Sequence, residues 1–169
     1  MTQKSLLEGK KILIVDDEAG ILEMLEEELE MCELSTASNF HQAKDLLESQ
    51  NFDMAILDIM GVRGYKLLDI ANNKKVIAVM LTAHALSPEN VVRSRREGAA
   101  SYVPKPKISD IHAVLVDILE AEEKGVSLWG RWHDRFGSYF DKLFGPNWNN
   151  YGEFWKETYS VKWEEKYFH

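Results

Sequence analysis

Acidic side chains stand directly after two apolar runs of the sequence. Asp16, Asp17 and Glu18 follow the run 12–15, and Asp58 follows another. Carboxylates about 5 Å apart repel by roughly 3 kcal/mol per pair at an effective dielectric constant of about 20, so such a cluster needs a cation. Hard oxygen ligands suit Mg2+, which keeps several waters and also binds phosphate oxygens. A divalent ion beside a carboxylate makes that carboxylate a usable nucleophile toward a phosphoryl group.

Two further polar groups end apolar runs later in the chain. Thr82 follows the run 76–81, and Lys105 follows the run 100–103 within a Pro-Lys-Pro triplet. In an open parallel sheet, ligands bind at the carboxyl ends of the strands, so these groups would meet the acids at one edge. We expect Asp58 to be the nucleophile because it stands alone at the end of the central strand, with the other acids as a metal cradle.

These positions depend on elements that the hydrophobic pattern predicts. The candidate strands are rich in Ile, Val and Leu, as parallel strands buried on both faces are. They alternate with helical patterns, an order that predicts a parallel sheet with right-handed crossovers and helices on both faces. Ser87 with Pro88 predicts a helix start, and Ser109 is a possible cap of the last helix. The predicted strands are 11–15, 34–38, 54–57, 76–81 and 100–103, and the helical patterns are 18–31, 40–48, 64–72, 88–97 and 111–118.

Length and composition limit the class of protein. The 169 residues, of which 45% are hydrophobic, suffice for one domain with a core plus an appendage. The net charge of −8 argues against binding to nucleic acid. The single cysteine, Cys32, excludes an intrachain disulfide and indicates a reducing compartment, which we take to be the cytoplasm. The opening residues lack the apolar region of a signal peptide, and no apolar run approaches the roughly 20 residues of a membrane span.

Four short motifs point to a known family. They are VDDE at 15–18, LDI at 57–59, LTA at 81–83 and YVPKP at 102–106, in this order along the chain. On an alternating strand and helix pattern, they make the first two thirds of the chain resemble a response-regulator receiver domain of two-component signalling. The resemblance implies an α/β fold of the flavodoxin-like (βα)5 type, a three-layer sandwich with a parallel five-stranded sheet. It implies signalling by phosphorylation, with a histidine kinase or a phosphotransfer protein as donor.

The resemblance also assigns roles to individual residues. Asp58 would be the phosphoacceptor and also a ligand of Mg2+. Asp17 would bind Mg2+ directly, with Asp16 close by or acting through water, and the backbone carbonyl of Met60 would be another ligand.

Three residues of the later motifs would serve the phosphoryl group. Thr82 would bond one phosphoryl oxygen and Lys105 would pair with another. Tyr102 occupies the position of the family's rotating aromatic switch. The Lys105–Pro106 bond would be the cis peptide that is common in the family.

One loop departs from the family pattern. The family usually has a proline four residues past the acceptor and a glycine eight past it, whereas Gly61 and Gly64 stand three and six residues past Asp58. The loop is about two residues short, and two glycines supply the unusual backbone angles that let it close.

The chain after the receiver pattern is aromatic. We predict a receiver domain over 1–124 and a helical extension over 125–169, with all five tryptophans in the extension. Within 129–143, five apolar residues follow one another by 3, 4, 3 and 4, which predicts one apolar helix face with a near-heptad seam. A second helical pattern covers 150–168. The aromatic extension has three alternative roles: a hairpin folded on the receiver, a homodimer seam or a docking surface for another protein. We expect a homodimer and no DNA-binding domain.

Two other functions compete with phosphorylation-dependent signalling. A phosphohydrolase working through an aspartyl-phosphate would need a second acid or base near the nucleophile, and Ile59 and Met60 offer none. A pseudo-receiver would serve only as an assembly module. We expect no enzyme activity beyond self-phosphorylation from a phosphodonor and autodephosphorylation.

Overall fold

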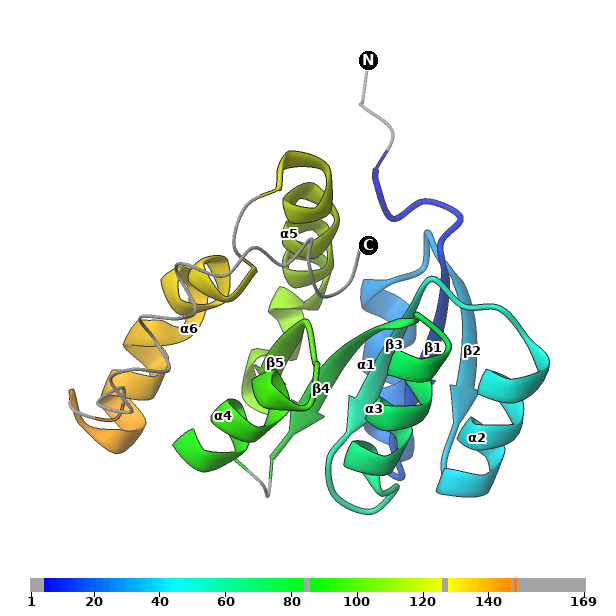
Figure 1. The fold of residues 1–169 in the computed structure, drawn as a ribbon, viewed down its shortest axis with the longest axis horizontal. Coiled ribbons are helices and arrows are strands. Elements are labelled where there is room, and N and C mark those ends of the chain that lie inside the picture. Colours follow the sequence, from blue (N-terminus) through cyan, green and yellow to red (C-terminus); the bar gives the residue numbers. More distant parts are fainter. Residues whose placement is uncertain (1–4, 84–85, 126–127, 147, 149–169) are drawn as a thin grey trace.

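A five-stranded parallel sheet forms the centre of the molecule, and helices cover both of its faces (Figure 1). The computed structural model describes residues 5–83, 86–125, 128–146 and 148. The strand order is β2-β1-β3-β4-β5, which confirms the predicted α/β fold. The strands are β1 (Lys11–Val15), β2 (Glu33–Ala37), β3 (Met54–Asp58), β4 (Ile77–Thr82) and β5 (Ser101–Pro104).

The central strands are buried because both of their faces meet helices. Every residue of β3 is buried, and in β1 only Lys11 is exposed. An all-apolar strand is stable only between two layers. The helices of the outer layers are α1 (Ala19–Glu28), α2 (Phe40–Ser49), α3 (Gly64–Asn73), α4 (Pro88–Arg96) and α5 (Ile111–Lys124). In the view of Figure 1, α1 and α5 lie behind the sheet, and α2, α3 and α4 lie in front of it.

Local capping agrees with one helix start and corrects another. Ser87 caps α4, since its side chain accepts a hydrogen bond from the backbone of Asn90, and Pro88 follows it. The prediction of Ser109 as the cap of α5 was wrong. Ser109 lies inside a 3-10 helix, η1 (Lys105–Asp110), which runs directly into α5 and leaves no extended residue there to act as a cap.

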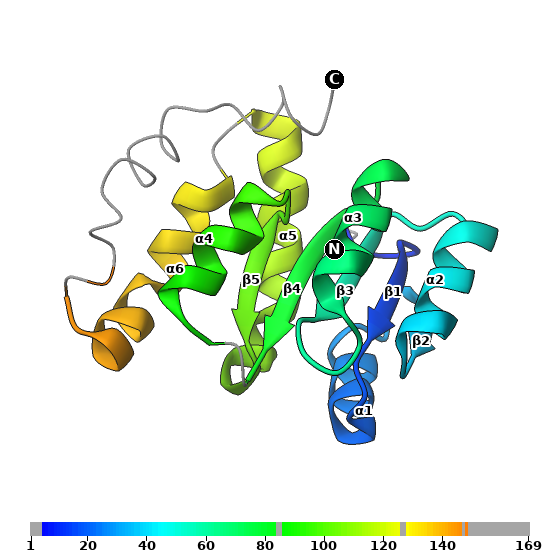
Figure 2. The ribbon, with the colours of Figure 1, turned by 60° about the horizontal axis from the view of Figure 1, so that its bottom comes forward.

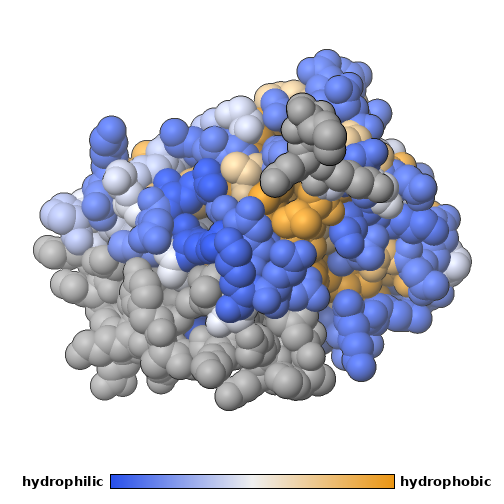
Figure 3. Space-filling view, turned by 90° about the horizontal axis from the view of Figure 1, so that it is seen from above, coloured by the Kyte–Doolittle hydropathy of each residue, from blue (hydrophilic) through white to orange (hydrophobic). Residues whose placement is uncertain are grey.

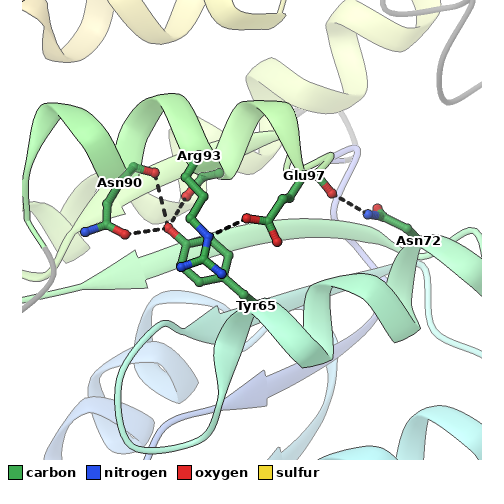
Figure 4. A network of polar contacts seen from close by, with 6 residues as sticks. Tyr65, Asn72, Asn90, Arg93 and Glu97 are labelled. Atoms are coloured by element: carbon green, nitrogen blue, oxygen red, sulfur yellow. Dashed lines mark hydrogen bonds and ion pairs between the residues drawn. The ribbon is translucent and has the colours of Figure 1, made fainter.

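A polar network ties α3 to α4 (Figure 4). The hydroxyl of Tyr65 on α3 lies 2.8 Å from Oδ1 of Asn90 and 3.2 Å from Oγ of Ser94 on α4. The guanidinium of Arg93 lies over the Tyr65 ring, 3.8 Å from its centroid. Asn72 donates a hydrogen bond to the carbonyl of Glu97 at the end of α4. The two helices are therefore held in register at several points along their length.

A sixth helix, α6 (Leu128–Phe144), lies beyond the edge strand β5 (Figures 1 and 2). It packs against β5 and α5. Its aromatic side chains at 129, 132, 136 and 140 are at most 3% exposed. Burying each side chain of this size contributes about 1.5–3 kcal/mol, so the docking of α6 is strong.

Polar contacts fix the position of α6. Arg131 forms an ion pair of 3.1 Å with Glu120, and Arg135 forms one of 2.7 Å with Asp117, both partners being on α5. The indole N–H of Trp148, just beyond the helix, donates to Asp141 over 2.6 Å.

The packing of α6 bears on the interpretations of the extension. Three residues of the predicted seam, Trp129, Trp132 and Phe136, are buried within their own chain, whereas Leu143 is 47% exposed. The apolar face of α6 therefore packs on the receiver of its own chain. The hairpin alternative requires this packing of 128–144. The second helical pattern, 150–168, lies outside the described residues, and the boundary after residue 124 stays a prediction.

Seen from above the view of Figure 1, the molecule shows an apolar area of surface between hydrophilic side chains (Figure 3). Among the described residues, Leu6 is the one large apolar side chain of the N-terminal segment that reaches 36% exposure, while its neighbour Leu7 is fully buried. No helix in the described part of the chain is both long enough and apolar enough to cross a membrane.

Candidate functional site

The ends of β1, β3 and β4 bring the predicted acids and hydroxyl to one edge of the sheet. Val15 is paired with Leu57, so Asp16 and Asp58 follow neighbouring positions on adjacent strands. Asp16, Asp58 and Thr82 are at most 3% exposed. Parallel strands in register end together, which is why residues far apart in the sequence meet here.

Lys105 is the cation of this cluster. It follows β5, and its side chain is 8% exposed. Its Nζ lies 2.9 Å from Oδ2 of Asp16, 3.0 Å from Oε1 of Glu18 and 3.6 Å from Oδ1 of Asp58. Thr82 is paired with Pro104, directly before Lys105, so strand pairing brings the hydroxyl and the cation to the same edge.

The excess of negative charge shows in the pKa values of the site. Burial, with the nearby charges of Asp16 and Asp17, raises the pKa of Asp58 to about 7 despite the opposing charge of Lys105. Burial also raises the pKa of Asp16, although the Glu18 backbone and Lys105 oppose it. For Lys105, burial favours the neutral amine, but hydrogen bonds to Asp16 and Glu18 outweigh it and raise the pKa. One lysine thus does not neutralise the acids.

The donor set fits a small divalent cation. One carboxylate oxygen from each of Asp16, Asp17 and Glu18 lies within 4.8 Å of the others. Oδ2 of Asp16 is buried, and the ammonium of Lys105 lies 2.9 Å from it. Oxygen ligands with an unneutralised charge suit Mg2+, which is held by one or two carboxylates and keeps open positions. Asp16 and Asp17 are the residues that would hold it.

The short loop after β3 is shaped by its two glycines. Gly61 has a φ of +87°, and a Cβ there would lie 2.5 Å from Oδ2 of Asp17. A Cβ on Gly64 would lie 2.2 Å from the carbonyl oxygen of Asp58. The amide of Gly64 donates to the carbonyl of Ile59, which closes the turn. The turn closes because both positions let backbone and carboxylate approach where a side chain would not fit. That the loop is shorter than usual for the family stays a prediction.

Tyr102 on β5 contacts α6. It is fully buried, and burial raises its pKa while a hydrogen bond with the backbone of Ser87 opposes the rise. The ring of Phe140 on α6 lies 6.3 Å from the Tyr102 ring, centroid to centroid. The role of Tyr102 as a rotating switch stays a prediction.

Two features of the site differ from the sequence interpretation. The Lys105–Pro106 bond is trans, as are all peptide bonds between described residues, so the predicted cis bond was wrong. Lys105 begins η1, and the chain enters this turn with Pro106 in a helical first turn, where a trans proline is well accommodated. Glu18 was predicted only as one of the acids of the metal cradle. It also lies 3.0 Å from Nζ of Lys105, which is 87 positions away in the sequence, and no local pattern reveals such a contact.

Met60 lies in the loop that follows β3. Its side chain is 53% exposed, so it does not fill the site. The part assigned to its backbone carbonyl as a metal ligand stays a prediction.

Comparison with known proteins places this geometry in a family. The family model described as the response regulator receiver domain matches residues 12–116. Among curated proteins, the two-component response regulator ARR10 of Arabidopsis thaliana is 33% identical over 132 residues, covering 70% of this chain and 24% of that protein. The matched region spans less than half the length of the first curated relatives.

Solved structures share the fold. A CheY-like receiver domain protein from Methanospirillum hungatei matches with a TM-score of 0.61 and 31% identity, over 70% of this chain and all of that one. The BeF3-activated receiver domain of DrrB, a Thermotoga maritima protein, matches with a TM-score of 0.59 and 26% identity, over 66% of this chain and 98% of that one. The chain belongs to the response regulator receiver domain family.

Proposed function

We propose that the protein is a phosphoacceptor response regulator that receives a phosphoryl group on Asp58. The donor would be a histidine kinase or a phosphotransfer protein, which is the donor class of two-component systems. The observation that carries the proposal is the buried Asp58 carboxylate with Lys105 at 3.6 Å and two acids beside it. Burying a carboxylate beside other carboxylates costs free energy, so this arrangement is typical of a functional site and not of a structural aspartate.

The residues of the site divide the work of transfer. One carboxylate oxygen of Asp58 forms a bond to phosphorus while the bond from phosphorus to the donor's leaving atom breaks. Lys105 exchanges part of its contact with Asp16 and Glu18 for a phosphoryl oxygen, and Thr82 donates its hydroxyl to another. A bound Mg2+ would supply charge neutralisation of the acids and of the transferring group.

Position and pKa both favour Asp58 as the acceptor. Only the ionised carboxylate is a nucleophile, and a pKa of about 7 leaves it partly protonated in the absence of a cation. Cation binding by Asp16 and Asp17 would favour the ionised form. The reaction should therefore require Mg2+.

Mass spectrometry of the intact protein tests the proposal. The full chain is incubated with acetyl phosphate and Mg2+, and a single phosphoryl adduct is expected. Asp58→Asn should give no adduct, whereas Asp53→Asn, directly before the first residue of the same strand, should react as the wild type does. An adduct on Asp58→Asn, or full labelling in EDTA, would refute the assignment, and no labelling at all would favour a pseudo-receiver.

We extend the proposal to the surroundings of the protein. The exchange would take place in the cytoplasm, as the single cysteine of the sequence indicates. Output would pass through protein contacts rather than nucleic acid, because the net charge is −8. The homodimer that the sequence predicted is not carried into the proposal for the unphosphorylated chain, because Trp129, Trp132 and Phe136 are buried within their own chain while α6 is docked.

A further inference from the structure

Four contacts of α6 fall on one short segment of the receiver, residues 99–107. The indole N–H of Trp129 donates to the carbonyl of Ala99 over 3.3 Å, and that of Trp132 donates to the carbonyl of Tyr102 over 2.6 Å. The Phe140 ring contacts the Tyr102 ring. The ammonium of Lys107 lies 5.0 Å from the centroid of another ring of α6, that of Tyr139.

The same segment carries the cation of the site. Lys105 lies three residues after Tyr102 and two before Lys107, and its Nζ bridges the acids at the ends of β1 and β3. Pairing of Thr82 with Pro104 joins the segment to the second group that would contact a phosphoryl oxygen. Any displacement of Lys105 or Thr82 toward a phosphoryl group therefore acts on backbone that α6 holds directly.

The burial of α6 decides whether a change at the site would release this helix or shift it in its docked position. Its aromatic side chains at 129, 132, 136 and 140 are at most 3% exposed, and its arginines are paired with α5. Release of the whole helix would expose all of these groups at once. A small change at the site is more easily met by a shift of the docked helix than by its release.

We propose that α6 is a permanently docked read-out helix, which senses the state of Asp58 through its contacts with Tyr102 and Lys107. It covers the edge strand that would otherwise be open to a partner, so the phosphorylation signal leaves the receiver through α6 and the extension. This inference rests on the proposed phosphoacceptor function of Asp58.

The chain contains its own reporter for the test. All five tryptophans lie at or after residue 129, so tryptophan emission reports the extension and not the sheet or the site. A full-length variant with Trp155→Phe and Trp163→Phe keeps Trp129, Trp132 and Trp148 as reporters. Mg2+ with beryllium fluoride serves as the phosphoryl probe, because the receiver domain of DrrB is activated by BeF3.

The expected result is a change in emission on addition of the probe, absent in Asp58→Asn. Phe140→Leu, which removes the ring beside Tyr102, should lose most of the change while still forming the acetyl phosphate adduct. Phe144→Leu is the matched control, because Phe144 is on the same helix and is 38% exposed. Its ring contacts Phe140 and not the receiver segment 99–107. This control should keep the full change.

Hydrogen exchange on the unmodified chain gives a second measurement that does not depend on how the variants fold. Amides of 128–144 should change their exchange rates on probe binding yet remain protected. An adduct on Asp58 without any change in emission or exchange would overturn the inference and leave the proposed function standing. Complete loss of protection in α6, or equal losses in both leucine variants, would also overturn it. Absence of an adduct would overturn the function and the inference together.

Discussion

At the scale of single residues, the two loop glycines show how closely the backbone is fitted to the site. A methyl group on Gly61 would meet the Asp17 carboxylate at 2.5 Å, and the φ of +87° strains any L side chain. The far end of an exposed aspartate can move aside, so the protein should still fold. What it loses is the position of a metal ligand.

We therefore predict that Gly61→Ala weakens Mg2+ binding by about 10–100-fold, the usual effect of disturbing a group that orients a metal ligand. Isothermal titration calorimetry of Mg2+ measures the change. Gly20→Ala is the matched control, because nothing lies within 4 Å of the added Cβ and it should leave the affinity as it is. Unchanged affinity in Gly61→Ala would show that Asp17 does not hold the ion.

The raised pKa of Asp58 makes the stability of the metal-free protein depend on pH. A carboxyl whose pKa is about 7 when folded and 3.8 when unfolded keeps its proton in the folded state. The folded state therefore loses stability as pH rises from about 4 to 7, by about 1.4 kcal/mol per pH unit. The accumulated loss is on the order of 4 kcal/mol.

Asp58→Asn removes this titration, so the variant should be more stable than the wild type in EDTA, and the gap should widen between pH 4 and 7. Urea unfolding at several pH values measures it. Asp45→Asn, which changes an exposed carboxylate on α2, should show no widening gap. If the free energy of unfolding changed with pH in the same way in wild type and Asp58→Asn, the raised pKa of the Asp58 carboxyl would be contradicted.

At the scale of elements, the indole of Trp132 ties α6 to the edge strand. Its N–H donates to the carbonyl of Tyr102 over 2.6 Å, and the side chain is 3% exposed. Trp132→Phe removes this hydrogen bond and part of the buried ring, which together should lower the free energy of unfolding by about 1–3 kcal/mol. Denaturant unfolding measures it, with Leu143→Ala on the exposed end of α6 as a control expected within about 0.5 kcal/mol of wild type. Equal effects would mean that α6 is not docked as described.

At the scale of the whole molecule, the docked α6 determines which surfaces are free. The tryptophans of the predicted dimer seam already face their own receiver, and two chains cannot share them without undocking both helices. We therefore expect the unphosphorylated full chain to scatter light as a monomer at micromolar concentration. A dimer that persists in Trp132→Phe would contradict this expectation and would mean that the homodimer forms through a surface other than the predicted seam.

Features that depend on residues close together in the sequence were predicted well, and features that depend on distant residues or on backbone geometry were not. Strand and helix positions were predicted closely, because burial on both faces of β3 and one-sided burial of the helices leave a periodic record in the sequence. The site residues came from what ends each strand, since parallel strands end together. Ser109 failed as a cap because η1 runs into α5 without a break, a matter of backbone geometry that residue type does not determine.

Residue types and spacing alone determined the sheet, its order of elements, the acids at its edge and the amphipathic character of 129–143. Each of these follows from local periodicity or from a strand end. Only the tertiary structure decided that Lys105 is shared by Asp16, Glu18 and Asp58, and that α6 lies on β5 of its own chain rather than on a second copy. An apolar face must be buried, but its pattern is the same whichever surface covers it, so the partner is settled by the shape and hydrogen bonds of the surface it meets.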